Sequence, residues 1–135
     1  MAFPAFLSAS LAVAIGGAIG AWLRFVVGRF YEVWLGPVRA SAFPWGTLTV
    51  NVLGSLAMGL LVGWLARHGA ISETSRLFLA VGVLGGFTTF SSFSMEFALM
   101  VERGAMAQAA LYVAVSLVAG FAALFAGLAM MRTSS

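Results

Sequence analysis

The sequence contains no cysteine, no lysine and no aspartate, and its only acidic residues are four glutamates. Without cysteine, disulfides, thiolate metal sites and cysteine nucleophiles are all excluded. Charged residues make up 8% of the chain, and the seven basic residues form no cluster of the kind that binds nucleic acid. No nucleophile–base pair, metal-ligand cluster or phosphate-binding loop is visible, so we do not expect an enzyme.

Hydrophobic residues fill 62% of the chain, and the mean hydropathy is +1.07. The charges leave four uncharged windows of 23, 27, 19 and 28 residues, at 1–23, 40–66, 77–95 and 104–131. Each window exceeds the roughly 18 residues that mark a membrane-spanning helix. We therefore predict an all-α membrane protein, with one domain over residues 1–135 and four transmembrane helices. Their expected ranges are about 5–27, 46–66, 76–101 and 105–131.

The residues that flank these ranges agree with a membrane protein. All three prolines (Pro4, Pro37 and Pro44) fall outside the expected spans. Trp45 and Trp64 bracket the second span, as interfacial anchors do. No basic segment precedes the first apolar stretch, so we do not expect a cleaved signal peptide.

The arginines divide almost evenly between the two sides of the membrane if the spans alternate in direction. Three lie on one side (Arg67, Arg76 and Arg132) and four on the other (Arg24, Arg29, Arg39 and Arg103). The positive-inside rule fixes an orientation only when the two sides differ. Two interpretations stay open: a weakly fixed single orientation, or a dual topology in which the same chain inserts both ways and pairs antiparallel.

The third expected span contains a segment unlike the rest of it, Gly-Gly-Phe-Thr-Thr-Phe-Ser-Ser-Phe at residues 85–93. Glycines are poor helix residues, and the hydroxyls can bond their own backbone instead of continuing a helix. Non-helical backbone persists in a membrane only where it is buried in protein or lines a wet cavity. We therefore predict a third helix that is broken mid-membrane, which is where small ions are often bound or passed.

Each span also carries polar or small residues four apart, and hence on one face. In chain order these are Gly16, Gly20 and Arg24; Thr47, Asn51 and Ser55; Thr88, Ser92 and Glu96; and Gln108, Tyr112, Ser116 and Gly120. Taken singly, such a stripe is best explained by close helix packing. Four stripes together favour a polar path, because ionisable groups such as Glu96 are costly inside a membrane. Arg24 lies nearer a span end, where it would snorkel or close a vestibule.

The phenylalanines of the third span alternate with hydroxyls, because Phe87, Phe90 and Phe93 are three residues apart. One interpretation is that the rings only fill space in the core or face lipid. The other uses the positive edge of the ring, which together with serine and threonine donors would solvate a small anion. A fixed lysine or arginine would hold that anion too tightly, whereas conduction needs weak and multiple sites.

At these positions the chain resembles the Fluc (CrcB) family of fluoride channels. The similar segments are 16–24 in the first span, 44–54 entering the second and 85–93 in the third, and their order in a chain of this length makes the match specific. The resemblance implies an antiparallel dual-topology homodimer in the cell inner membrane. It also implies passive export of cytoplasmic fluoride, which lowers intracellular fluoride and its toxicity.

The resemblance further implies particular site residues. A structural sodium ion that is not transported would be held by the backbone carbonyls of Gly85 and Thr88. Pore residues are implied at Asn51, Phe90, Phe93, Tyr112 and Ser116, with Ser92 and Glu96 as a polar track beside them. Fluoride is strongly hydrated, and the amide and hydroxyl donors in this set would replace its water.

Two other functions remain open. A small proton-coupled multidrug transporter is also four-spanned and dual in topology, but it needs a carboxylate deep in the membrane. In that family the carboxylate lies in the first span, whereas the candidate here is Glu96 in the third. A non-transporting membrane subunit or assembly factor is the other, and it predicts no flux from the pure protein in liposomes.

Overall fold

The computed structural model describes residues 3–69 and 71–133, and its regular elements there are all helical. In order they are α1 (Phe3–Leu35), α2 (Pro37–Ala42), α3 (Trp45–His68), α4 (Glu73–Arg76), the π-helix η1 (Leu77–Leu84), α5 (Gly85–Phe87), α6 (Phe90–Glu102) and α7 (Met106–Thr133). Among these described residues, four ranges are long and apolar enough to cross a membrane, namely Phe3–Leu35, Trp45–His68, Glu73–Glu102 and Met106–Arg132. The predicted all-α class with four spans is therefore confirmed.

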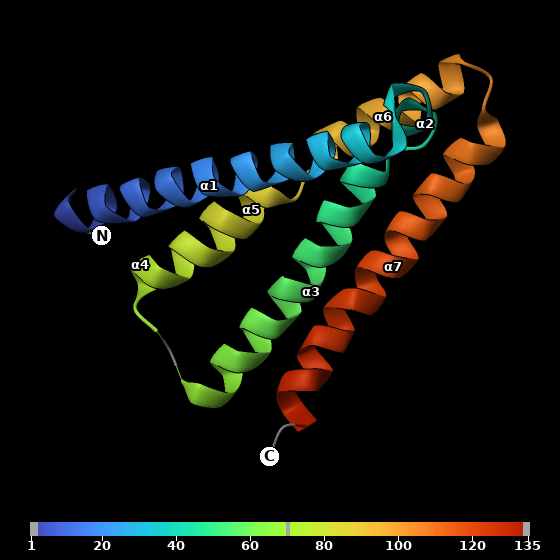
Figure 1. The fold of residues 1–135 in the computed structure, drawn as a ribbon. Helices are drawn as coiled ribbons and strands as arrows, with labels where there is room; N and C mark the ends of the chain where they lie inside the picture. Colours follow the sequence, from blue (N-terminus) through green and yellow to red (C-terminus); the bar gives the residue numbers. More distant parts are fainter. Residues whose placement is uncertain (1–2, 70, 134–135) are drawn as a thin grey trace.

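The spans pack as two pairs: α3 lies along α7, and α1 lies along η1 and α5. Figure 1 shows the pairs meeting where α2 and α6 lie and diverging toward the two chain ends. The buried hydrophobic core is small in the part of the chain that the structure describes, with Val50, Met100, Ala109 and Tyr112 as its members. Most other large apolar side chains face outward, as the surface of a membrane protein requires.

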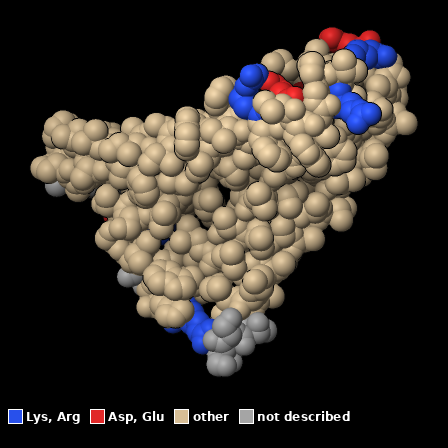
Figure 2. Space-filling view, in the orientation of Figure 1, with Lys and Arg blue, Asp and Glu red and all other residues tan. Residues whose placement is uncertain are grey.

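Charged side chains gather at the ends of the spans. In Figure 2 they cluster at the upper right and at the lower tip, and the face between them is almost free of charge. Two contacts identify which loops share an end: Arg103 Nη1 donates to the Ser41 carbonyl at 3.2 Å, and Arg67 Nη1 donates to the Met131 carbonyl at 3.3 Å. Arg103 and Arg67 therefore lie at opposite ends of the spans, as alternating spans predict.

The first helix is longer than predicted: it runs to Leu35 rather than ending near residue 27. The prediction placed the end of the helix where charged residues begin. Charged residues end the apolar stretch, but the helix continues through them. Arg29 and Glu32 pair one turn apart and continue the helix until Gly36, which has φ 77° and precedes Pro37. At about 1.5 Å per residue, the 33 residues of α1 span about 50 Å, more than the hydrocarbon thickness of about 30 Å. Pro4 lies inside this helix, in its first turn, where a missing N–H is tolerated.

The third span is assembled from several pieces. It opens with α4, continues as the π-helix η1, for which the sequence gives no signal, and then as α5. Thr88 (φ −82°, ψ 160°) and Thr89 (φ −153°, ψ 125°) have extended backbone before α6 begins at Phe90. Gly85 is helical, with φ −64° and ψ −38°, so the non-helical residues are the threonines, and Gly86 serves another purpose.

That purpose is close helix packing. A Cβ atom on Gly20 would lie 2.1 Å from the Val83 carbonyl oxygen, and one on Gly86 would lie 2.6 Å from the Gly17 carbonyl oxygen. In the other pair, a Cβ on Gly59 would lie 2.1 Å from the Leu124 carbonyl oxygen. Real Cβ atoms do not approach backbone so closely, so these positions exclude any side chain. The packing interpretation of these small residues is therefore confirmed.

We expect Gly20→Ala and Gly59→Ala to separate the helices of their pairs, because the added methyl meets backbone that cannot rotate away. Overpacking costs about 1–3 kcal/mol when side chains can yield, and more is expected where backbone must move. Size-exclusion profiles and thermal unfolding in detergent measure the effect. Gly17→Ala is the matched control, since no atom lies within 4 Å of its added Cβ. Equal stability of all three variants would contradict this account of the glycines.

Candidate functional site

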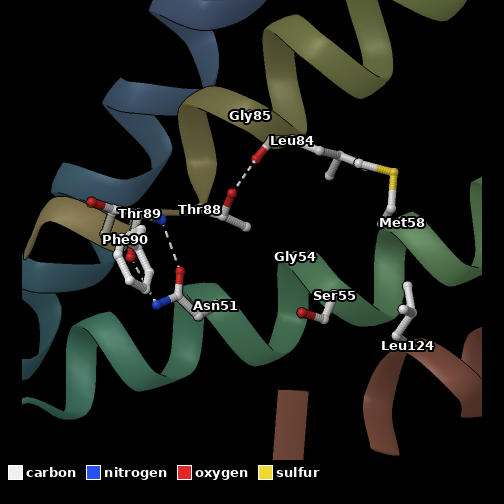
Figure 3. A pocket seen from close by; sticks show the side chains of 10 residues that line it. All are labelled: Asn51, Gly54, Ser55, Met58, Leu84, Gly85, Thr88, Thr89, Phe90 and Leu124. Carbon is white, nitrogen blue, oxygen red and sulfur yellow. Dashed lines mark hydrogen bonds between the residues drawn. The ribbon is translucent and has the colours of Figure 1, made fainter. Parts of the chain in front are cut away.

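Asn51 of α3 holds Thr89, the second of the two extended residues of the third span (Figure 3). The Asn51 Nδ2 group donates to the Thr89 carbonyl at 3.0 Å, and the Thr89 N–H donates to Asn51 Oδ1 at 2.8 Å. Both halves of one side-chain amide thus replace the helical hydrogen bonds that Thr89 lacks. Thr89 is only 7% exposed, so an unpaired N–H or carbonyl there would be costly.

The remaining polar groups of Thr88 and Thr89 also have partners. Arg24 of α1 donates from Nη1 to the Thr88 carbonyl at 3.3 Å, and the Thr88 N–H donates to the Leu84 carbonyl at 3.0 Å. The Thr89 hydroxyl accepts the Ser92 N–H at 3.2 Å and caps α6. Every backbone polar group of the two threonines is therefore satisfied, which non-helical backbone in a membrane requires.

This arrangement leaves the Gly85 carbonyl without the donor it would have in a continuous helix. In a continuous helix the Thr89 N–H would donate to the Gly85 carbonyl four residues earlier, but here it donates to Asn51. Gly85 and Thr88 both line a cavity of about 340 Å³ with Asn51, Phe90 and Leu124, which we call the Asn51 cavity. Carbonyl oxygens suit hard cations, and the Thr88 oxygen has a second lone pair besides the one that accepts Arg24. The two carbonyls are thus suited to a cation such as sodium.

A second polar cluster joins three spans around Glu96 of α6. Thr47 of α3 donates from Oγ1 to Glu96 Oε1 at 2.6 Å, and Tyr112 of α7 donates from its hydroxyl to Oε2 at 2.7 Å. Tyr112 is fully buried. Each carboxylate oxygen therefore accepts a short hydrogen bond, so three of the four polar stripes meet at one point.

A second cavity of about 440 Å³ opens beside Glu96, and we call it the Arg24 cavity. Its polar lining residues are Arg24, Tyr31, Glu32, Thr47, Ser92 and Glu96, and the others, Phe25 among them, are apolar or glycine. Arg24 was expected near a span end, as a vestibule residue. The structure places its guanidinium against Thr88 in the middle of the third span, while the side chain also lines this cavity. The cavity contains hydroxyls, one arginine and two carboxyl groups.

The phenylalanines of the third span have different surroundings. The Phe93 ring lies 5.0 Å from the Tyr112 ring and 5.7 Å from the Phe90 ring, measured between centroids. Phe93 and Phe87 are partly buried, whereas Phe90 is 79% exposed and lines the Asn51 cavity. A ring in that position needs lipid or a second protein chain to cover it.

Ser116 of α7 completes the set of residues predicted from the sequence. Its hydroxyl oxygen is buried and has no hydrogen-bond partner within the described residues. A buried hydroxyl without a partner is costly, and it commonly marks a bound water or ion. Gln108, which shares the stripe of Ser116, is exposed instead.

The structure thus divides the predicted residues between two cavities. Asn51, Gly85, Thr88 and Phe90 line one, and Arg24, Ser92 and Glu96 line the other, with Tyr112 and Phe93 packed beside Glu96 and Phe90. Thr47 and Thr89 were not named as site residues, although the stripe that contains Thr47 pointed to it. The contact of Arg24 with Thr88 joins residues 64 positions apart and has no sequence signal.

Four apolar spans that enclose polar cavities define a multi-pass membrane protein. The sequence pattern of the family described as CrcB-like protein, Camphor Resistance (CrcB), matches residues 11–128. The chain belongs to the CrcB family.

Several relatives are similar over almost their whole length. A Novosphingobium aromaticivorans protein named fluoride-specific ion channel FluC is 58% identical over 126 residues, which cover 93% of this chain and 98% of that protein. Proteins of the same name from Sphingopyxis alaskensis and Caulobacter vibrioides are 56% and 52% identical. They cover 89% and 90% of this chain, and the matched parts are 92% and 94% of those proteins.

Proposed function

We propose that this protein is a fluoride-specific ion channel of the cell inner membrane, through which cytoplasmic fluoride leaves passively down its electrochemical gradient. The observation that carries the proposal is the 58% identity, over 93% of the chain, to a protein named fluoride-specific ion channel. The chemistry of the spans supports it, because they hold many neutral donors. A catalytic role has no support in the residues around either cavity.

Fluoride enters a pore only if protein donors replace its water. Ser92 and Ser116 offer hydroxyls, and Asn51 Nδ2 has a second N–H besides the one that donates to Thr89. The single O–H of Tyr112 donates to Glu96 here, and in this proposal it turns from that carboxylate to the passing anion. The ring edges of Phe90 and Phe93 add weak positive contacts that release the ion readily.

The working form in this proposal is an antiparallel homodimer of a dual-topology chain, with the interruption at Thr88 and Thr89 at mid-membrane. The 79% exposure of Phe90 supports a partner, since a second copy would cover this ring and close the Asn51 cavity. The near balance of three arginines against four supports insertion in both directions.

A structural sodium ion fits the same interface. The Gly85 and Thr88 carbonyls of two copies would supply four oxygens and no carboxylate, a neutral set that suits a hard cation. Sodium would supply a fixed positive charge that links the extended segment at Thr88 and Thr89 of one copy to the same segment of the other. In this proposal it is not transported.

We expect two lysines added at the C-terminus to bias insertion toward one orientation, because the arginine balance is so close. The variant expressed alone should lose most of its activity, since antiparallel pairs could no longer form. Fluoride tolerance of cells measures this, and co-expression with a chain biased the opposite way should restore it. Full activity of a chain shown to insert in one orientation only would contradict the antiparallel dimer.

The proposed function is tested by fluoride release from proteoliposomes that contain the purified protein, followed with a fluoride electrode. A channel releases fluoride without a proton gradient when a potassium ionophore balances the charge. A proton-coupled multidrug transporter would instead carry an organic cation in response to a pH gradient. A non-transporting subunit would release nothing, and either of those results would overturn the proposal.

A further inference from the structure

Arg24 lies between the two cavities. Its side chain lines the Arg24 cavity with Ser92 and Glu96, and its Nη1 reaches the carbonyl oxygen of Thr88 at 3.3 Å. Thr88 in turn lines the Asn51 cavity. One guanidinium group therefore borders the cavity with the hydroxyls and also contacts an oxygen of the proposed sodium site.

Among the residues that the structure describes, no carboxylate forms an ion pair with Arg24. The ion pair found within the described residues joins Arg29 and Glu32, and the hydrogen bond that Arg24 makes is to the neutral Thr88 carbonyl. The carboxyl groups that line the same cavity are Glu32, paired with Arg29, and Glu96, whose oxygens accept from Thr47 and Tyr112. A partly buried cation without an ion pair attracts an anion and repels another cation.

The attraction of Arg24 for an anion and its repulsion of a cation both bear on the Thr88 carbonyl oxygen. A sodium ion on this oxygen would share it with a guanidinium group, and the repulsion between the two charges weakens binding of the ion. An anion in the Arg24 cavity would draw the guanidinium away or offset its charge, and sodium would then bind more tightly. By thermodynamic linkage, sodium would strengthen anion binding by the same factor.

We propose that Arg24 sets the sodium affinity of the Gly85–Thr88 site and couples that affinity to an anion in the Arg24 cavity. This inference rests on the proposed sodium site. It assigns Arg24 a positioning role, because the residue acts on the ion through the Thr88 carbonyl. The alternative is that Arg24 only satisfies that carbonyl, in which case its removal would weaken sodium binding.

The test is a sodium titration of the purified full-length protein in detergent, at constant ionic strength with N-methylglucamine as the replacement cation and gluconate as the anion. The readout is the thermal unfolding midpoint, which rises as an ion binds the folded state. For Arg24→Gln we expect the half-saturating sodium concentration to fall about tenfold. Adding fluoride should lower it in the wild type and leave it unchanged in Arg24→Gln.

Arg39→Gln is the matched control, because it removes the same charge from an exposed position that lines neither cavity, and it should behave as the wild type. If Arg24→Gln does not fold, sodium titrations of the wild type with and without fluoride still test whether anion binding and sodium binding are coupled. Equal or weaker sodium binding in Arg24→Gln, or no effect of fluoride on the wild type, would overturn the coupling alone. A wild type that does not respond to sodium would overturn the sodium site and the coupling with it, while fluoride release from proteoliposomes tests the channel separately.

Discussion

Fluoride flux should fall at least about a hundredfold in Phe90→Ile and in Phe93→Ile, while each purified protein stays folded and monodisperse. Isoleucine keeps an apolar side chain of similar size, so a packing role alone would cost only about 1–3 kcal/mol of stability. What isoleucine lacks is the positive ring edge. Phe90 should show the loss most clearly, because its 79% exposed side chain has little packing within the chain to lose.

Initial rates of fluoride release from proteoliposomes, set beside thermal unfolding of the same preparations, separate the two roles of the rings. Phe6→Ile is the matched control, since it makes the same change at a 58% exposed position in the first turns of α1. Near-normal flux in both third-span variants would return these rings to a space-filling role. The hydroxyls and Asn51 would then have to carry the ion without them.

Asn51→Ala should abolish flux and also lower the unfolding midpoint, which distinguishes it from the phenylalanine variants. The substitution leaves the N–H and the carbonyl of buried Thr89 without the partners they have at 2.8 and 3.0 Å. Each orphaned group costs about 1–3 kcal/mol, and the extended backbone loses what holds it to α3.

Ser55→Ala, one turn further along α3, is the control for Asn51→Ala. Ser55 lines the same cavity, and its hydroxyl makes none of the hydrogen bonds that hold the extended backbone. Flux and unfolding midpoint are measured on both variants. An Asn51→Ala protein as stable as the wild type would show that the amide does not hold Thr89 in place.

The spans were predictable because their signal is local. Uncharged windows longer than about 18 residues locate transmembrane helices without any knowledge of packing. The end of α1 was missed because the ion pair of Arg29 with Glu32 and the turn at Gly36 lie beyond the apolar run. The π-helix was missed because its sequence, Leu77–Leu84, differs from an ordinary apolar helix in no visible way.

The candidate site was predictable in composition more than in arrangement. Residues four apart had to share a face, so the meeting of Thr47, Glu96 and Tyr112 follows once the spans pack together. The glycines of residues 85–93 suggested where the helix would stop, but both are helical. Gly86 permits contact with α1, and the threonines carry the extended backbone. The use of Asn51 as a clamp on Thr89 depends on how α3 packs against the third span, which no local pattern encodes.

The central claim is passive conduction of fluoride, and the reversal potential of the purified protein in a planar bilayer tests it most directly. With unequal fluoride concentrations on the two sides, we predict that the current reverses at the fluoride equilibrium potential. A pH gradient, a sodium gradient or replacement of the other anions should leave that potential unchanged. A reversal potential that follows the proton or sodium gradient would contradict passive conduction, because it would mean that fluoride movement is coupled to a second ion.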